Sequence, residues 1–391
     1  MEIGYTPEQL ALRARLRDYY DQLLDEETVR ELSHARGVGP VMRRVWKQMC
    51  SDGWAGVGWP EEWGGQGFSA IEQFVFFDES MRAGAPVPML TINTVGPTIM
   101  RFGTDEQKQF FLPKILGGEI HFAIGYSEPG AGTDLASLTT RAVRDGDEYV
   151  INGQKMWTSL ASDADFVWLA VRTNPEVKKH QGISILAVPL DTPGITISPL
   201  TLLPDHDINQ VFFDDVRVPV TSCVGGENNG WTLITNQLNH ERVTLCASGG
   251  CERALDEVRA WAQETTLPDG RRVIDQEWVQ LNLARVAANL EVLRLMNWQV
   301  AWEQTQGVLD IGHCSAVKVH GTERNLEAWR LLMEVLGPAA YLKADSPGAV
   351  LRSRLEGMYR GTLILTFGGG TNESQRDLIS QFTLGLPRAN R

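Results

Sequence analysis

The 391-residue chain is predicted to be mainly α-helical, with a β-domain in the middle of the sequence. Three observations support this fold class. Apolar residues recur at helical spacing over residues 1–120, short segments rich in β-branched and aromatic residues follow over 121–225, and helical spacing returns over 226–391. We therefore expect an N-terminal helical domain, a central β-domain and a C-terminal helical bundle.

The N-terminal region begins with a clear helix start. Thr6 is suited to cap the helix and Pro7 to occupy its first turn, and leucines follow at mostly helical spacing. A loop rich in Gly, Trp and Pro covers residues 56–67, and helical segments resume over 71–83 and 104–119. This part of the chain is therefore predicted to consist of helices around one glycine-rich loop.

The central region has the pattern of a small antiparallel β-sandwich or barrel. Its candidate strands are separated by turn sequences such as Asp145-Gly146 and Asn152-Gly153. The strand segments are residues 121–128, 149–159, 165–173, 182–190, 195–200 and 207–220.

The C-terminal region contains long segments at helical spacing with short links between them. Because such helices pack as antiparallel neighbours, we expect a four-helix bundle. The candidate helices cover residues 230–264, 277–304, 322–337 and 353–366.

Charge and composition exclude several classes of protein. The 36 Lys and Arg against 49 Asp and Glu give a net charge of −13, which argues against nucleic-acid binding and a polybasic membrane anchor. No apolar run approaches the roughly 18 residues of a membrane span, and the charged N-terminus does not resemble a signal peptide. The five cysteines form no CxxC pair, which is typical of a reduced, cytoplasmic protein.

Common metal and nucleotide motifs are also missing. His240-Glu241 begins like HExxH, but Thr244 stands where the second histidine would be, so we expect no zinc site there. Neither a GxxxxGK[ST] segment nor a GxGxxG turn between strand and helix is present, which argues against P-loop and Rossmann nucleotide binding.

Glu241 falls on an otherwise apolar stripe at helical spacing. The other members of this stripe are Trp231, Ile234, Leu238, Leu245, Ser248, Leu255 and Val258. Burial raises the pKa of a carboxylate towards the range of a general base. A buried ion pair with a neighbour such as Arg242 accounts for the same pattern, and spacing by itself favours this structural interpretation.

Two glycine loops and one tryptophan segment indicate ligand contact. Glycines at 127–134 and 367–373 allow backbone N–H groups to approach an anionic or planar ligand, and hydroxyl side chains stand beside them. The indole in Trp157-Thr158-Ser159 can stack on a flat heteroaromatic ring. Taken singly, each loop is more often an ordinary turn and the tryptophan more often a core residue.

Six segments together carry a resemblance over nearly the whole chain. They are GWPEEWGG at 58–65, FGTDEQKQFFLPKILGGE at 102–119, YSEPGAGTD at 126–134, INGQKMWTS at 151–159, NHER at 239–242 and GGGTNESQRDLI at 368–379. In order and spacing they resemble the acyl-CoA dehydrogenase family. The resemblance implies that family's fold, with an N-terminal helical domain, a small β-barrel or sandwich and a C-terminal four-helix bundle.

The resemblance also implies a chemistry and a cofactor. The family uses FAD to desaturate an acyl-CoA thioester: a carboxylate removes the α-proton, and the β-hydrogen passes as hydride to flavin N5. An electron-transfer flavoprotein is the implied electron acceptor. The implied roles are flavin contacts from Tyr126, Ser127, Gly132 and Thr133, stacking by Trp157, a hydrogen bond near N5 from Ser159, and contacts to the adenine-dinucleotide portion from Thr371 and Glu373.

The position of the catalytic base departs from the commoner family pattern. Most members carry the base as the Glu of a Tyr-Glu-Gly-Thr loop, where this chain has Gly369. A minority place it on the first long helix of the C-terminal bundle, and Glu241 matches that position, with Arg242 as its neighbour on the substrate side. This match reverses the structural interpretation and makes Glu241 the expected base. The Gly369 N–H is expected to polarise the thioester carbonyl.

Two further departures imply a partner subunit. In homo-oligomeric members, Arg-x-x-Phe-Gly and Gln-x-x-Gly-Gly stretches complete the flavin site of a neighbour. Residues 264–278 here contain no Arg-x-x-Phe-Gly, and Glu334 introduces an anion in place of the neutral glutamine. We therefore expect an α₂β₂ heterotetramer in which a related, different acyl-CoA dehydrogenase subunit completes the flavin site.

Within the family, the sequence of these segments is most similar to that of the base-bearing subunit of actinobacterial steroid side-chain acyl-CoA dehydrogenases of cholesterol catabolism. That similarity implies a steroid-CoA thioester as substrate. Two other interpretations stay open: a non-catalytic partner subunit of such a complex, and an acyl-CoA oxidase on the same scaffold.

Overall fold

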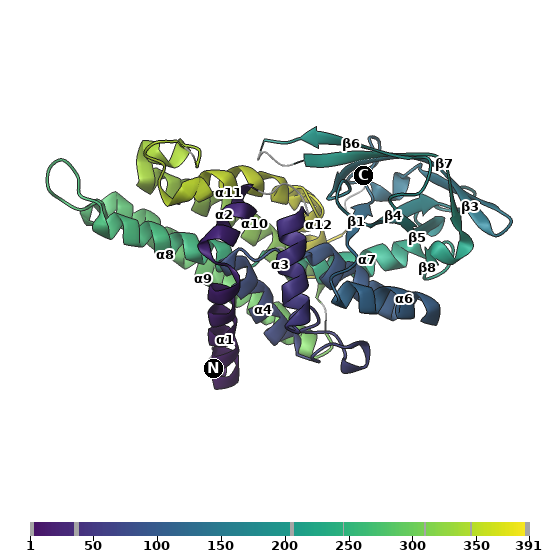
Figure 1. Ribbon diagram of the computed structural model, residues 1–391, viewed down its shortest axis with the longest axis horizontal. Helices are drawn as coiled ribbons and strands as arrows, with labels where there is room; N and C mark the ends of the chain where they lie inside the picture. Colours follow the sequence, from purple (N-terminus) through teal and green to yellow (C-terminus); the bar gives the residue numbers. More distant parts are fainter. Residues whose placement is uncertain are drawn as a thin grey trace. The chain divides into compact units, whose positions relative to one another are not determined.

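The computed structural model of the protein describes residues 4–34, 39–203, 207–244, 246–308, 310–344 and 346–387. The chain divides into two compact units (Figure 1). The sheet unit comprises Leu24–Phe68 and Pro86–Glu241, and the bundle unit comprises Met1–Leu23, Ser69–Ala85 and Arg242–Arg391.

The sheet unit is built around an eight-stranded sheet in the order β6-β7-β3-β2-β4-β5-β8, with β1 paired to β4. Pairing is antiparallel except for β1 with β4 and β2 with β4, which run parallel. The strands are β1 (Phe122–Gly125), β2 (Arg141–Asp145), β3 (Glu148–Ser159), β4 (Phe166–Arg172), β5 (Ile183–Pro189), β6 (Ile195–Thr201), β7 (Asp207–Pro219) and β8 (Cys223–Val224).

The middle of this sheet is buried because its strands are covered on both faces. β4 and β5 carry almost uninterrupted buried residues, the pattern of strands without a solvated face. All six predicted strand segments are confirmed, and β2 and β8 are additional. The helices of this unit are α2 (Glu26–His34), α3 (Pro40–Ser51), α5 (Gly96–Phe102), α6 (Asp105–Leu116) and most of α7 (Gly230–Thr244). A π-helical segment, η2 (Leu90–Val95), directly precedes α5.

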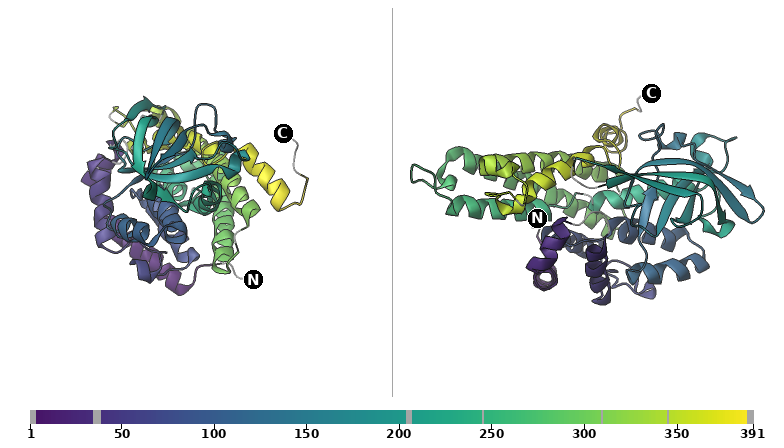
Figure 2. Two further views of the ribbon diagram at one scale, coloured as in Figure 1. Left: turned by 90° about the vertical axis from the view of Figure 1, so that its right-hand side faces the viewer. Right: turned by 45° about the horizontal axis from the view of Figure 1, so that its top comes forward.

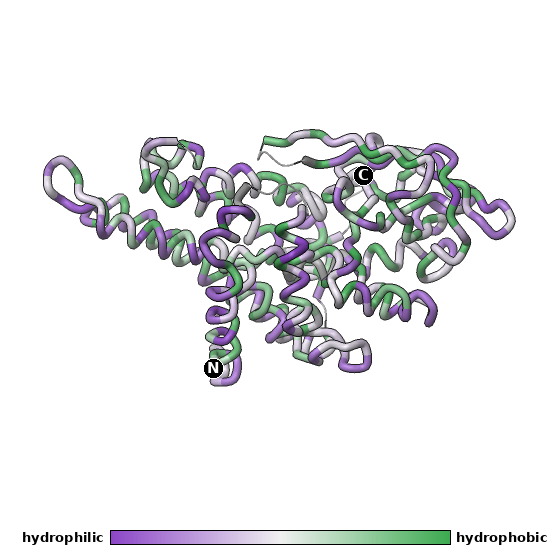
Figure 3. The backbone as a smooth tube through the Cα atoms, in the orientation of Figure 1, coloured by the Kyte–Doolittle hydropathy of each residue, from purple (hydrophilic) through white to green (hydrophobic). Residues whose placement is uncertain are grey.

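The bundle unit is helical. Its helices are α1 (Pro7–Leu23), α4 (Ala70–Ala83), α8 (Gly249–Glu264), α9 (Glu277–Thr305), α10 (Ile311–Leu336), α11 (Arg354–Thr362) and α12 (Asn372–Phe382). α8, α9 and α10 run along one another (Figure 2). Their shared core contains apolar side chains such as Val258, Val286 and Leu332. Apolar and polar residues are interleaved along these helices (Figure 3), as expected for helices with one buried face.

The predicted N-terminal helix start is confirmed. The Gln9 N–H donates to Thr6 Oγ1 at 3.3 Å, and the Thr6 N–H donates back to Gln9 Oε1 at 3.1 Å. This reciprocal cap fixes the first turn of α1, with Pro7 at its first position.

The single long helix predicted over 230–264 is wrong, because α7 ends at Thr244 and α8 begins at Gly249. A Cβ at Gly249 would lie 2.1 Å from the Asp78 carbonyl oxygen of α4, so only glycine fits here. The Gly249 N–H also donates to the buried Asp78 carboxylate at 2.8 Å, which satisfies one free donor of the new helix. The predicted apolar stripe therefore spans two helices rather than one.

Within the described ranges, no helix combines the length and the apolar character needed to cross a bilayer.

Candidate active site

The loop after β1 presents its tip to solvent. Main-chain hydrogen bonds of 2.9 and 3.1 Å join Glu128 and Ala131 and close a tight turn. Gly132 and Thr133 follow this turn and are exposed, and a Cβ added at Gly132 would meet no described atom within 4 Å. The loop therefore leaves room for a ligand close to its backbone.

Tyr126, at the base of this loop, is buried. Its hydroxyl donates to Gln237 Oε1 of α7 at 2.5 Å, and Trp168 Nε1 of β4 donates to the same oxygen at 3.1 Å. These bonds tie the end of β1 to α7. The Gln237 amide nitrogen is buried and has no partner in the described part of the chain.

A buried ion pair anchors the loop to the sheet. Lys155 Nζ of β3 lies 2.8 Å from Glu128 Oε1 and 3.1 Å from the Tyr126 carbonyl oxygen, and neither charged side chain is significantly exposed. Burial raises the pKa of Glu128, but the Lys155 ammonium and hydrogen bonds from Thr139 and Thr140 outweigh it and lower the pKa to about 2. Burial lowers the pKa of Lys155 to about 8. At neutral pH the pair is ionised and holds the loop base in place.

The end of β3 contains a bulge that brings a tryptophan to the surface. The pairing with β7 shifts register between Lys155 and Thr158, and Trp157 adopts a left-handed backbone with φ of 63°. Its side chain is 52% exposed, so the alternative of an ordinary core tryptophan is excluded. The Met156 N–H donates to the Ser127 carbonyl at 2.8 Å, which brings this segment next to the β1 loop.

Two hydroxyl groups flank the exposed indole. The Thr158 hydroxyl is fully buried and lacks a hydrogen-bond partner among the residues described, and Ser159 is half-buried. The exposed ring of Trp157 offers a flat apolar face. Ser159 carries a hydroxyl two residues further on, and Ser127 carries one on the loop that is bonded to Met156. This set of groups fits a flat heteroaromatic ligand such as a flavin ring.

The second glycine loop lies in the bundle unit, before α12. Gly369 and Gly370 have φ of 68° and 96°, values that favour glycine. The buried Lys318 of α10 donates from Nζ to the Gly370 carbonyl at 2.7 Å. Thr371 caps α12 by accepting the Ser374 N–H at 3.1 Å. The loop is thus held in a shape that a residue other than glycine would strain.

Glu373 stands in the first turn of α12 and is exposed. Its pKa is lowered by hydrogen bonds from its own backbone N–H and from Thr371, with a smaller effect of Arg376. The carboxylate is therefore ionised beside a helix N-terminus, where a bound phosphate would meet the N–H groups and this negative charge together.

The expected base, Glu241, is the last residue of the sheet unit along the chain, and Arg242 is the next residue, in the bundle unit. The backbones of Glu241 and Arg242 belong to α7, whereas their side chains lie outside the described residues. Of the predicted stripe before the helix break, Ile234 is buried and Trp231 is half-buried. The site thus falls into separate groups: residues 126–133 and 157–159 in the sheet unit, and Gly369, Thr371 and Glu373 in the bundle unit.

Sequence reasoning missed Lys155, although a signal for it was present. Along β3, Tyr149, Ile151 and Lys155 share a parity that places them on one face of the strand, and all three are buried. A lysine on such a face requires an anionic partner, which is Glu128.

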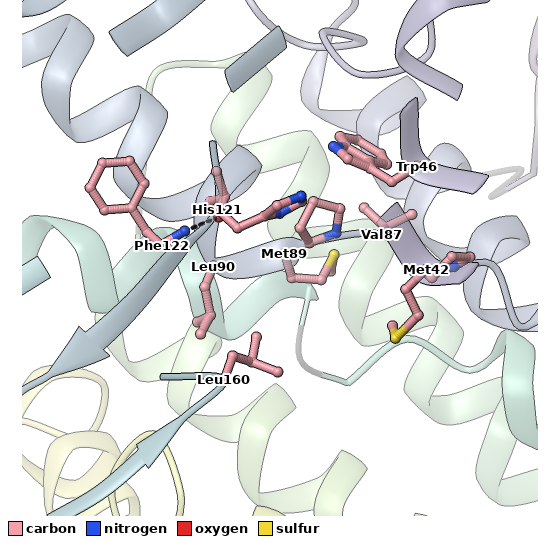
Figure 4. Close-up of a pocket in the computed structure, with 11 residues that line it drawn as sticks. Met42, Trp46, Val87, Met89, Leu90, His121, Phe122 and Leu160 are labelled. Atoms are coloured by element: carbon pink, nitrogen blue, oxygen red, sulfur yellow. Dashed lines mark hydrogen bonds between the residues drawn. The ribbon is translucent and has the colours of Figure 1, made fainter. Parts of the chain in front are cut away.

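A cavity in the sheet unit was also missed. It has a volume of about 200 Å³ and is lined mainly by apolar side chains of α3 and of residues 86–91, together with Leu160 and His121 (Figure 4). Leu160 directly follows the Trp157–Ser159 segment. No local periodicity predicts such a cavity, because its walls come from distant segments of the chain.

Family models match almost the full length of the chain. The acyl-CoA dehydrogenase N-terminal domain matches residues 6–119, the middle domain residues 123–216 and the C-terminal domain residues 228–384.

Curated relatives match the chain from end to end. Acyl-CoA dehydrogenase FadE26 of Mycobacterium tuberculosis is 58% identical over 401 residues, covering 100% of both chains. Acyl-CoA dehydrogenase FadE29 of the same organism is 46% identical over 394 residues, again covering 100% of both.

Solved structures agree with these matches. A chain of the ChsE4-ChsE5 complex from Mycobacterium tuberculosis has a TM-score of 0.93 at 57% identity, covering 100% of both chains. A chain of the Tcur3481-Tcur3483 steroid acyl-CoA dehydrogenase has a TM-score of 0.94 at 48% identity, with the same coverage. The three domain models and the end-to-end relatives show that this chain is an acyl-CoA dehydrogenase and belongs to that flavin-dependent enzyme family.

Proposed function

We propose that this chain is the base-bearing subunit of a heteromeric acyl-CoA dehydrogenase that acts on a steroid side-chain CoA thioester. The observation that carries the proposal is the end-to-end similarity to a chain of a steroid acyl-CoA dehydrogenase complex and to a chain of the ChsE4-ChsE5 complex. Cytoplasmic steroid catabolism is the proposed setting.

FAD is the proposed cofactor. The exposed Trp157 ring and the Ser127 and Ser159 hydroxyls would hold the flavin ring, Gly132 and Thr133 its phosphate end, and Thr371 with Glu373 the adenine-dinucleotide portion. Supporting observations are the room beside Gly132 and the buried, unpartnered Thr158 hydroxyl, which a polar ligand atom would satisfy. When bound, FAD supplies the two-electron acceptor for the substrate β-hydrogen, with an electron-transfer flavoprotein as the next acceptor.

Glu241 is the proposed base that removes the α-proton. The loop that carries the base in most relatives has Gly369 instead, with a left-handed backbone that suits glycine, so this chain has no carboxylate there. In this proposal the Gly369 N–H stabilises negative charge that develops on the thioester oxygen, and Arg242 contacts substrate. Closing the site to water would strengthen both interactions.

A surface stripe on α9 supports the proposed partner subunit. Five large apolar side chains lie exposed on one heptad line of this helix: Trp278, Leu281, Val292, Leu295 and Trp302. Positions at this spacing face a neighbouring helix in helical assemblies. Exposed large apolar side chains gathered on one side of a helix are typical of a protein interface.

In two regions this chain lacks the stretches with which homo-oligomeric family members complete a neighbour's flavin site. The residues found there instead support a partner that is a different chain rather than a second copy. Glu334 is exposed on α10 and accepts a hydrogen bond from Asn282 at 3.2 Å. Arg271 and Arg272 are paired with carboxylates of their own loop, Asp269 and Asp275. A closed assembly of two copies of each chain, with about two FAD in total, follows from this proposal.

The test is to express the chain alone and with the related subunit encoded beside it, and to compare FAD content and assembly. The complex is then offered straight-chain acyl-CoAs and steroid-CoA thioesters, with loss of the flavin absorption band followed without oxygen. We expect FAD and a preference for steroid-CoA only in the complex. A lone chain that forms a homotetramer with four tightly bound FAD, or a clear preference for short straight chains, would contradict the proposal.

Glu241→Gln tests the base, with Glu176→Gln on an exposed loop as the matched control. Loss of a general base lowers turnover by about a hundredfold or more, so we expect at least that loss for the first variant and none for the second. Turnover within a few-fold of wild type would favour the non-catalytic subunit. Rapid peroxide formation in air would favour an oxidase.

A further inference from the structure

The cavity of about 200 Å³ in the sheet unit is almost entirely apolar. Met42 and Trp46 of α3 form one wall, Val87, Met89 and Leu90 another, and Leu160 closes a third side (Figure 4). Apolar cavities of about 150 Å³ bind ligands the size of benzene. This cavity therefore has room for a ring or a branched hydrocarbon group.

His121 is one of the polar side chains in these walls, together with Thr91. Its side chain is 2% exposed, and both ring nitrogens lack a hydrogen-bond partner in the described part of the chain. Burial, with a smaller effect of the Arg43 guanidinium, lowers the pKa of His121 to about 4. At neutral pH the imidazole is uncharged and presents one donor and one acceptor, and leaving both unpaired costs stability.

The main chain of His121 is fixed by two hydrogen bonds to Asp165. Its N–H donates to Asp165 Oδ2 at 2.7 Å, and its carbonyl accepts from the Asp165 N–H at 2.9 Å. The ring is directed towards the side of the cavity formed by Trp46 and Val87 (Figure 4). The backbone of His121 is thus held in place, and the ring forms part of the cavity wall with both nitrogens buried and unpaired in the described part of the chain.

The opposite wall is fixed by a π-helical segment, η2, a local structure that often marks functional sites. Trp59 Nε1 donates to the Ile92 carbonyl at 3.0 Å, and the Phe122 N–H donates to Thr91 Oγ1 at 2.9 Å. The first bond satisfies a main-chain carbonyl of η2, and the second ties the Thr91 side chain of the cavity wall to β1.

Water is a poor occupant of this space. A buried water makes about three hydrogen bonds. The lining offers few polar side chains: His121, and Thr91, whose hydroxyl accepts the Phe122 N–H and keeps its own proton to donate. A largely apolar ligand with one oxygen matches the lining better.

We propose that this cavity receives an apolar ring portion of the acyl substrate and that His121 determines specificity by hydrogen bonding to a single hydroxyl or carbonyl oxygen on it. The inference rests on the proposed function, because it assigns the cavity to the acyl group of that reaction. Leu160, which lines the cavity, directly follows the 157–159 segment assigned to the flavin, so one stretch of chain contributes to both.

The first test uses phenol and toluene, two ligands of matched shape, with binding to the assembled complex measured by calorimetry. The variants are His121→Leu, His121→Gln, which keeps a donor and an acceptor, and His180→Phe as an exposed control. We expect the phenol-to-toluene affinity ratio to fall about tenfold in His121→Leu and to be kept in the other two. An equal ratio in wild type and His121→Leu would overturn the proposal.

The unfolding temperature gives an independent readout. Since the unpaired imidazole is costly in the free protein, His121→Leu is expected to melt no lower than wild type without ligand. A histidine with a merely structural role would instead leave the variant melting lower and the affinity ratio unchanged, which would also overturn the inference.

The second test compares two steroid-CoA thioesters that differ only by one ring oxygen. We expect His121→Leu to reduce the preference in kcat/KM for the oxygenated thioester about tenfold, through KM rather than kcat. If neither thioester is turned over while the phenol preference depends on His121, the proposed function fails and the cavity assignment stands. If both thioesters are turned over with a preference that His121→Leu does not change, the cavity assignment fails and the proposed function stands.

Discussion

The ion pair between Lys155 and Glu128 allows a quantitative prediction. Replacing Lys155 by Met keeps the aliphatic stem and removes the ammonium that lies 2.8 Å from the Glu128 carboxylate. The carboxylate then stays buried with bonds only from Thr139 and Thr140, at 2.7–2.9 Å. Removing one member of a buried pair costs about 3–5 kcal/mol, a large part of a typical total stability of about 5–15 kcal/mol.

The assay is urea unfolding of the assembled enzyme followed by tryptophan fluorescence, together with the FAD-to-protein ratio. Arg217→Met is the matched control, since Arg217 pairs with Asp145 and Glu148 on the exposed side of the same sheet. An exposed pair contributes about 0–1 kcal/mol, so the control is expected to change little. Hydrogen exchange of residues 126–134 is expected to increase only in Lys155→Met.

A double variant separates the pair from its surroundings. Because Glu128→Gln removes the unpaired charge, Lys155→Met combined with it is expected to cost less than the sum of the two single changes, by about 1–3 kcal/mol. If Lys155→Met costs no more than Arg217→Met, or if the two changes simply add, the pair does not hold the loop in the way described.

Three further changes are expected to have measurable effects. The pKa of the buried Asp78 is raised to about 7, first by burial and then by the neighbouring Glu252. Its contribution to stability is therefore greatest at low pH and is lost as pH rises towards 7. Asp78→Asn is expected to reduce the difference in urea midpoint between about pH 5 and about pH 7.5. Gly96→Ala would place a Cβ 2.2 Å from Trp59 Cζ2 and is expected to lower the unfolding free energy by about 1–3 kcal/mol in the same assay, whereas an unchanged midpoint would refute that contact. Leu281→Lys, on the exposed α9 stripe, is expected to weaken assembly with the partner subunit in sedimentation experiments. The melting temperature of the lone chain should not change, and unchanged assembly would argue against the stripe as an interface.

Much of the fold could be predicted because local signals decide it. Thr6 and Pro7 start α1 where the cap predicts, and all six candidate strands form. The helix break before Gly249 could not be predicted from spacing, since it depends on the Asp78 carbonyl of a helix 171 positions earlier. Parallel pairing of β1 and β2 with β4 likewise depends on partners distant in the sequence.

For the site, motif order was sufficient to identify the family, and the roles of Glu241, Gly369 and the flavin-contacting residues stay predictions. In a chain with a net charge of −13, the exposed Gly132 backbone and the α12 N-terminus would offer N–H groups to an anionic cofactor.

By itself, then, the sequence determined the order of elements and the family, because periodicity, caps and motif spacing act between near neighbours. Only the tertiary structure decided that Lys155 meets Glu128, that Trp157 is exposed, and that His121 faces an apolar cavity unpaired. These features depend on burial and on contacts between distant segments, which local spacing does not encode.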